Sequence, residues 1–126
     1  MTLMRVRLEL ARSPEFPEGS NARGYDFTAP LTKDGRLDAE EWKKNAGACT
    51  VRRFWEGAED EHGVLAHRRG AWCFDYDPKK AEDDEPIFKL DRHTIRQDDY
   101  LSITEHDGVT RTFKVARMSP RVLPER

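Results

Sequence analysis

Residues 5–10 alternate between charged and apolar side chains. Val6, Leu8 and Leu10 fall on one face of an extended chain, whereas Arg5, Arg7 and Glu9 fall on the opposite face. A period of two is typical of a β-strand with one buried and one solvated face. The pattern therefore predicts an opening strand that ends at Ser13–Pro14.

Further apolar segments of strand length follow. Residues 14–24 contain two prolines and two glycines and are predicted to form a loop. Tyr25, Phe27 and Ala29 then alternate with polar residues and predict a second strand that ends at Pro30. Later strands are predicted in the following segments: 49–55, 64–67, 71–76, 87–90, 99–105 and 109–117.

One helix is predicted at residues 38–45. Asp38 precedes Glu41 by three positions, which is the spacing of a capping box. Leu37 and Trp42 occupy the positions of a hydrophobic staple, and Asn45 with the glycine that follows supplies a stop signal. The helix has room for about two turns, so we expect it to plug or cross a sheet.

The two predicted hairpins differ in how well the sequence specifies their register. A three-residue turn at 106–108 places Leu101 opposite Phe113, which pairs two apolar residues on one face. A three-residue turn at 68–70 would place Ala66 opposite Trp72 and Val64 opposite Phe74.

Short strands joined by hairpins, with one small helix, predict a mainly β fold. We expect a small twisted barrel or rolled antiparallel sheet of six to eight strands, because closure removes unpaired edges. A single domain over residues 1–126 is expected from the chain length. The segment 78–86 is predicted to be a mobile, charged loop.

Composition narrows the functional classes. Hydrophobic and charged residues each make up 37% of the chain, and the net charge is −2. This balance disfavours nucleic acid as the main partner, since dedicated nucleic-acid binders are usually strongly basic. Two cysteines do not form a disulfide scaffold, and the absence of a long apolar run disfavours a membrane protein. We therefore expect a cytoplasmic protein that is a monomer or weak homodimer.

A metal site is one hypothesis for the chemistry. In the predicted register His67 and Cys73 are diagonal neighbours, and a third ligand could come from His93, Cys49 or Asp75. The alternative is that His67 and His93 form ordinary hydrogen bonds and that Cys73 packs as a small hydrophobe. The spacings match no closed zinc site, so no metal and no cofactor are predicted.

A binding surface is the leading hypothesis. Trp55, Trp72 and Tyr76 supply large rings, and Arg68 and Arg69 supply charge at a hairpin tip. A half-exposed aromatic ring is a natural anchor for a partner. The alternative is that these rings form the core and that Trp42 covers them.

Three segments carry a resemblance to known proteins. They are Gly24–Leu31, Val51–Trp55 and the region from Asp99 to Val115. In these segments the chain resembles a family of short uncharacterised bacterial proteins with no known activity, and its last hairpin also resembles that of SH3-like small barrels. The resemblance implies a bacterial, stand-alone domain. It does not point to any functional residue.

The sequence thus favours a non-catalytic binding or accessory module whose partner is an unknown protein or small ligand. A small metal-assisted enzyme is the first alternative, and a single-stranded nucleic-acid binder is the second.

Overall fold

The computed structural model describes residues 2–68, 71–76, 85–89, 94–105 and 107–122. Eight strands and two short helices lie in this described part of the chain. The strands are β1 (Thr2–Leu10), β2 (Ser20–Ala29), β3 (Thr50–Trp55), β4 (Glu61–Arg68), β5 (Ala71–Asp75), β6 (Glu85–Lys89), β7 (Tyr100–Thr104) and β8 (Thr110–Val122). The helices are α1 (Ala39–Asn45) and the 3-10 turn η1 (Ala46–Ala48).

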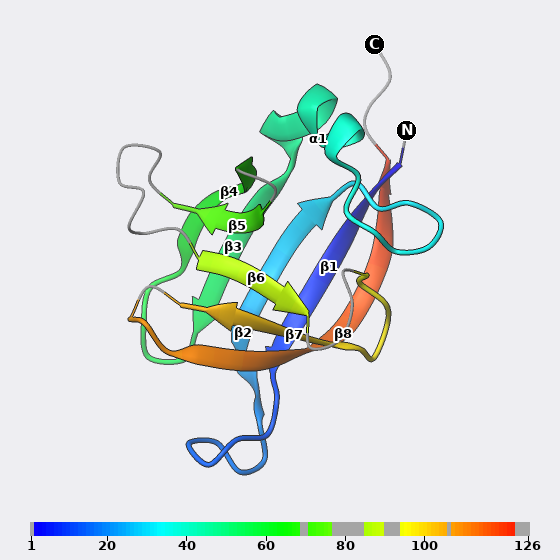
Figure 1. The fold of residues 1–126 in the computed structure, drawn as a ribbon. Coiled ribbons are helices and arrows are strands. Elements are labelled where there is room, and N and C mark those ends of the chain that lie inside the picture. Colours follow the sequence, from blue (N-terminus) through cyan, green and yellow to red (C-terminus); the bar gives the residue numbers. More distant parts are fainter. Residues whose placement is uncertain (1, 69–70, 77–84, 90–93, 106, 123–126) are drawn as a thin grey trace.

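The strands form a closed antiparallel barrel in chain order, with β8 pairing back onto β1 (Figure 1). The predicted mainly β fold with one short α-helix is confirmed. Closure leaves no unpaired edge among the described strands, which removes the usual route to edge-to-edge association.

Alternating residues point into the barrel and form its core. Val6, Leu8 and Leu10 are buried as the opening pattern predicted. Tyr25, Phe74 and Phe113 meet in the centre of the barrel, with ring centroids 5.1 and 5.2 Å from Tyr25. The charged residues of β1 therefore lie on the outer face of the barrel.

The helix begins as its capping sequence predicts. Asp38 accepts a hydrogen bond from the Glu41 backbone N–H at 3.2 Å, and α1 ends at Asn45. The chain then continues into η1 instead of stopping at once. The indole of Trp42 donates to the Leu65 carbonyl at 2.9 Å, so α1 is attached to one end of the barrel (Figure 1).

The last hairpin has the predicted register. Leu101 pairs with Phe113, and both are buried. Arg111 pairs with Ile103, and its side chain is only 14% exposed. This arginine enters a cluster of charges that is described with the site below.

The register predicted for the β4–β5 hairpin is wrong by one residue. Leu65, and not Val64, pairs with Phe74, while His67 pairs with Trp72. Pairing continues to Arg68 and Ala71, so the connection contains two residues instead of three. Side chains alternate between the two faces of a strand. A shift of one residue therefore changes which side chains of β4 and β5 lie on the same face.

Several strand boundaries also differ from the prediction: β4 begins at Glu61 and not at 64, and β8 continues to Val122 and not only to 117. β2 begins at Ser20, inside the predicted loop 14–24, because an irregularity in the pairing at Leu10 lets this segment join β1. β6 begins at Glu85 because Glu85 pairs with Phe74. The rest of the predicted mobile loop, up to residue 84, lies outside the described residues.

Within the described residues, neither helix combines the length and the apolar character that a membrane crossing requires.

Candidate functional site

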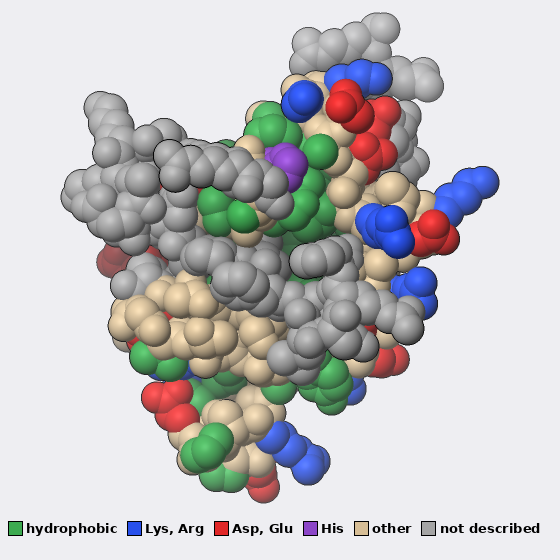
Figure 2. Space-filling model, in the orientation of Figure 1, with side chains coloured by type: hydrophobic (Ala, Val, Ile, Leu, Met, Phe, Trp, Pro, Cys, Tyr) green, Lys and Arg blue, Asp and Glu red, His purple; other side chains and the backbone are tan. Residues whose placement is uncertain are grey.

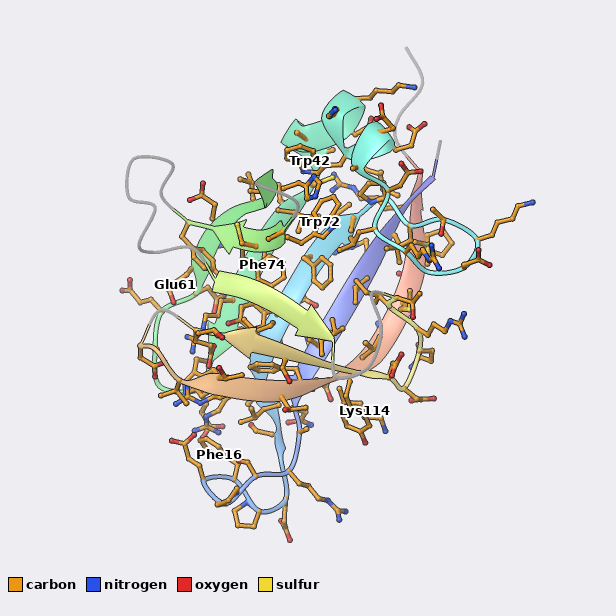
Figure 3. The ribbon with its side chains drawn as sticks, viewed as in Figure 1. Phe16, Trp42, Glu61, Trp72, Phe74 and Lys114 are labelled. Carbon is orange, nitrogen blue, oxygen red and sulfur yellow. The ribbon has the colours of Figure 1, made fainter. Side chains whose placement is uncertain are left out.

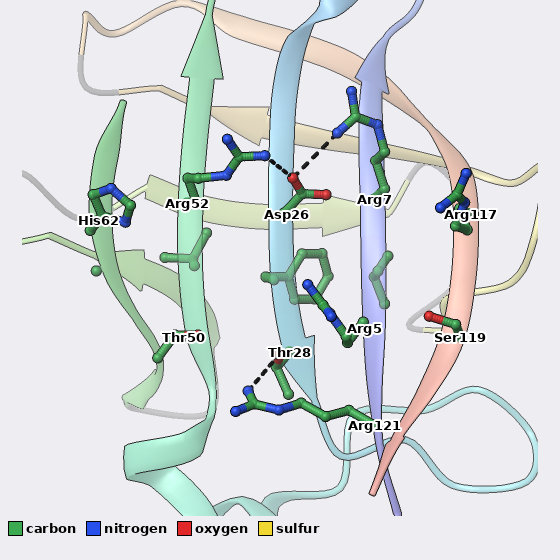
Figure 4. A pocket seen from close by; sticks show the side chains of 14 residues that line it. Arg5, Arg7, Asp26, Thr28, Thr50, Arg52, His62, Arg117, Ser119 and Arg121 are labelled. Atoms are coloured by element: carbon green, nitrogen blue, oxygen red, sulfur yellow. Dashed lines mark hydrogen bonds and ion pairs between the residues drawn. The ribbon is translucent and has the colours of Figure 1, made fainter. Parts of the chain in front are cut away.

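The most distinctive surface feature is a basic groove on the outside of the barrel. It crosses β8, β1, β2, β3 and the start of β4 and encloses a volume of about 850 Å³ (Figure 4). Among the described residues that line it, Asp26 is the single carboxylate. The cationic side chains of the lining are Arg5, Arg7, Arg52, Arg117 and Arg121.

Strand register explains why these side chains meet. One row of directly paired residues runs across five strands. Its members, from β4 to β8, are His62, Arg52, Asp26, Arg7 and Arg117. Paired residues on one face have Cβ atoms about 5 Å apart, so each side chain can contact the next.

A second row lies next to the first. Arg5 pairs with Thr28 on one side and with Ser119 on the other, so a residue with a hydroxyl group flanks it on each neighbouring strand. The groove therefore combines charge with uncharged hydrogen-bond donors.

A β-bulge brings Arg117 into the groove. Leu8 pairs with Val115 but Arg7 pairs with Arg117, so Ala116 is an extra residue in β8. Val115 points into the core, and simple alternation would send Arg117 to that same face. The bulge reverses this direction, and Gln97 donates to the Ala116 carbonyl at 2.8 Å.

Charge pairing divides the groove into two halves. Asp26 accepts from both Arg7 and Arg52, and Arg52 also contacts Asp60 at 3.0 Å. The hydrogen bond to Asp26 raises the pKa of Arg52 above its ordinary value. We call this part the paired half.

The other part of the groove, which we call the open half, contains Arg5, Arg117 and Arg121. Arg5 and Arg117 are exposed and form no ion pair or side-chain hydrogen bond with any residue that the structure describes. Arg121 has two long contacts, at 3.5 Å to the Thr28 hydroxyl and 3.4 Å to the Ala48 carbonyl. Positive charge in this half is therefore available to a ligand.

A second set of charges lies inside the barrel and is fully compensated. Glu105 is 3% exposed and accepts from Tyr25 at 2.6 Å, Arg53 at 2.8 Å and Arg111 at 2.7 Å. Burial alone would lower the pKa of Arg53, but the hydrogen bond to Glu105 and the carboxylate charge raise it above its ordinary value. For Arg111 burial likewise acts to lower the pKa, and hydrogen bonds to Glu15, Glu105 and Asp107 outweigh it. Each charge of this cluster therefore has a partner of opposite sign.

The predicted aromatic surface is not brought together. Trp55 lies beside the interior cluster, where the Arg53 guanidinium is 4.3 Å from its ring centroid and Phe16 packs edge-on at 6.1 Å. Trp72 lies at the helix-covered end, where His67 stacks on it at 4.2 Å and Trp42 packs edge-on at 5.9 Å. Figure 3 shows Phe16 and Trp42 at opposite ends of the barrel.

Neither Trp72 nor Tyr76 lines the groove. Trp72 and Tyr76 are both half-buried against the core. Arg68 ends β4, and Arg69 lies outside the described residues. On the face of the molecule shown in Figure 2, the coloured basic and acidic side chains are interspersed.

The proposed metal ligands are also separated. His67 pairs with Trp72, whereas Cys73 pairs with Ala66, so the two side chains point to opposite faces and not to one face as predicted. His93 lies outside the described residues. Within the described part of the chain, no three histidine, cysteine or acidic side chains are grouped so that they could hold a metal ion.

Sequence reasoning identified the outward direction of Arg5 and Arg7 but not the groove. Alternation alone shows which face a side chain occupies within its own strand. It does not show that β8 and β3 flank this region of β1 and β2, nor that a bulge adds Arg117.

No family model matches the chain, and neither a curated protein nor a solved structure matches it significantly. Resemblance to short bacterial proteins and to SH3-like barrels therefore stays a prediction. Fold and site together define an antiparallel barrel, eight-stranded in its described part, that carries an arginine-lined outer groove.

Proposed function

We propose that the protein is a non-catalytic binding module whose ligand is anionic and binds in the outer groove. The observation that carries the proposal is the convergence of five arginines and one aspartate from adjacent strands of a chain whose net charge is −2. Arginine is suited to this task because its planar guanidinium stays charged and donates several hydrogen bonds to carboxylate or phosphate oxygens.

The energetic cost of this arrangement supports a ligand. Arg7 and Arg117 are directly paired across β1 and β8, and like charges in that position oppose strand pairing. Asp26 forms an ion pair with Arg7 but not with Arg117. A bound anion would offset the charge of Arg117 and of Arg5.

A single-stranded nucleic-acid binder is less well supported. Such proteins stack bases on exposed aromatic rings along a basic channel. Phe27 in the groove lining is 3% exposed, and Phe54 is covered by the guanidiniums of Arg7 and Arg52 at 4.4 and 5.2 Å. The described groove thus offers charge without a stacking surface.

The proposal includes a small ligand, a monomeric state and a cytoplasmic location. Both cysteines are free and buried, which fits a reducing compartment. Barrel closure favours a monomer because the described strands are all paired on both sides.

A heparin oligosaccharide, a polyanion without phosphate, tests the proposal. We expect binding at low ionic strength that weakens steeply as salt is added, because exposed charges are screened. The double variant Arg5→Gln/Arg117→Gln should lose this binding. The matched control, Arg36→Gln/Lys33→Gln, removes the same charge from exposed residues outside the groove and should retain it. Equal affinity of the two double variants, or failure of the parent protein to bind heparin and small inorganic or organic anions alike, would refute the proposal.

A further inference from the structure

The open half of the groove has the composition of a site for one compact anion. Arg5 lies between Thr28 and Ser119 in its row, and Arg117 is its diagonal neighbour across β1 and β8. Diagonal neighbours on a sheet have Cα atoms about 7–8 Å apart, which lets two arginine side chains reach one shared group. Figure 4 shows Arg5, Arg117, Ser119 and Thr28 around one part of the groove, with Arg121 beside Thr28.

Asp26 limits how far an anion can extend. It lies on β2, two residues before Thr28 and diagonal to Arg5, and it already holds Arg7 and Arg52. An extended polyanion crossing the groove would pass this carboxylate and find two arginines whose charge is already compensated. A single charged group between Arg5 and β8 lies on the side of β1 away from that carboxylate, so it meets less repulsion.

We propose that the open half binds the phosphate group of a small phosphate monoester. The inference rests on the proposed function and specifies the ligand. A dianionic phosphate has three terminal oxygens, enough to accept from two guanidiniums and a hydroxyl at once. Ser119 supplies a hydroxyl donor, the buried Thr28 holds Arg121 through its own hydroxyl, and Arg5, Arg117 and Arg121 supply the charge.

Calorimetric titration with glycerol 3-phosphate tests the inference, with inorganic phosphate and sulfate as parallel probes at constant ionic strength. We expect the ester to bind the parent protein at pH 7.5. Arg5→Gln and Arg117→Gln should each weaken binding at least tenfold, as expected for the loss of a charge-assisted hydrogen bond. Arg36→Gln should leave the affinity unchanged.

The pH dependence identifies the dianion. A phosphate monoester loses its second proton near pH 6, while arginine stays charged. Affinity for the ester should therefore rise several-fold from pH 5.5 to 7.5, and affinity for sulfate should not rise. Histidine titrates in this range, and Asp26 faces the same groove, so the series is repeated with His62→Gln and Asp26→Asn. The rise should persist in both variants.

The outcomes separate this inference from the proposed function. Heparin binding without ester binding would overturn the phosphate inference and leave the anion-binding groove intact. Binding of inorganic phosphate but not of the ester, or ester binding that Arg117→Gln does not weaken, would also overturn it. Absence of binding to heparin and to every phosphate probe would overturn both.

Discussion

Two groups of arginines lie on the two sides of the same barrel wall and have opposite electrostatic surroundings. Arg53 and Arg111 point inward and share the buried carboxylate of Glu105. Arg5 and Arg117 point outward and contact no carboxylate among the described residues. Arg52 and Arg53 are adjacent in the sequence, yet one lines the groove and the other lies in the interior cluster.

The difference follows from the cost of removing charge from water. A buried guanidinium must be paired and hydrogen-bonded, since an uncompensated buried charge costs several kcal/mol. An exposed guanidinium keeps its hydration and needs no partner for the protein to fold. The inner arginines are therefore committed to stability, and the outer arginines are free to bind a ligand.

The largest effect is expected from removing the shared carboxylate. Glu105→Gln keeps the shape of the side chain but leaves Arg53 and Arg111 without their common counter-charge. We expect the free energy of unfolding to fall by about 3–5 kcal/mol, measured by urea denaturation.

Glu15→Gln is the matched control for this variant. Glu15 also pairs with Arg111, but it is 56% exposed, so its loss should cost less than about 1 kcal/mol. Equal effects of the two substitutions would show that the interior cluster does not stabilise the fold through its charges.

The buried thiol of Cys49 reports on Arg121, an outer arginine whose charge acts on its pKa. Burial raises the pKa of Cys49 from 9.0 to about 11, and the charge of Arg121 acts against this shift. A pKa that is higher in the folded state means that the folded protein holds its proton longer. The stability from this group is thus present below pH 9 and is lost between pH 9 and 11.

Over that interval the free energy of unfolding should fall by about 2 kcal/mol more in the parent protein than in Cys49→Ala. Arg121→Gln should enlarge the fall, because it removes the charge that favours the thiolate. Denaturation series at pH 8, 9, 10 and 11 measure both differences. Parallel curves for the parent and Cys49→Ala would contradict the expectation.

The smallest effect on stability is expected at Asp26. Asp26→Asn breaks exposed or half-exposed ion pairs to Arg7 and Arg52, so unfolding should change by less than about 1 kcal/mol. The same substitution releases two arginines and should tighten binding of heparin several-fold.

Asp60→Asn provides the comparison, because Asp60 pairs with Arg52 at 3.0 Å but does not line the groove. It should change heparin affinity less than Asp26→Asn does. If Asp26→Asn weakens binding instead, the division into paired and open halves is wrong.

Several features of the barrel could be predicted because they depend on neighbours in the sequence. Alternation from Val6 to Leu10 identified the buried and solvated faces of β1. Asp38 and Glu41 identified the helix start. For the last hairpin, one register alone paired Leu101 with Phe113, so burial of apolar surface selected it.

The β4–β5 hairpin shows where local information was insufficient. A turn of two residues at 69–70 and a turn of three residues at 68–70 both fit the local sequence. Pairing of Leu65 with Phe74, two large buried side chains, is realised in the barrel because both point into the core beside Tyr25. The choice depended on core packing contributed by other strands.

The sequence by itself determined the strands, the helix cap and the outward direction of Arg5 and Arg7, since each depends on residues a few positions apart. Tertiary structure alone decided the groove. Barrel closure pairs β1 with β8, whose residues lie more than 100 positions later in the chain. The bulge at Ala116 then turns Arg117 to the outer face. Those contacts join strands that are distant in sequence, so no local pattern of residues carries them.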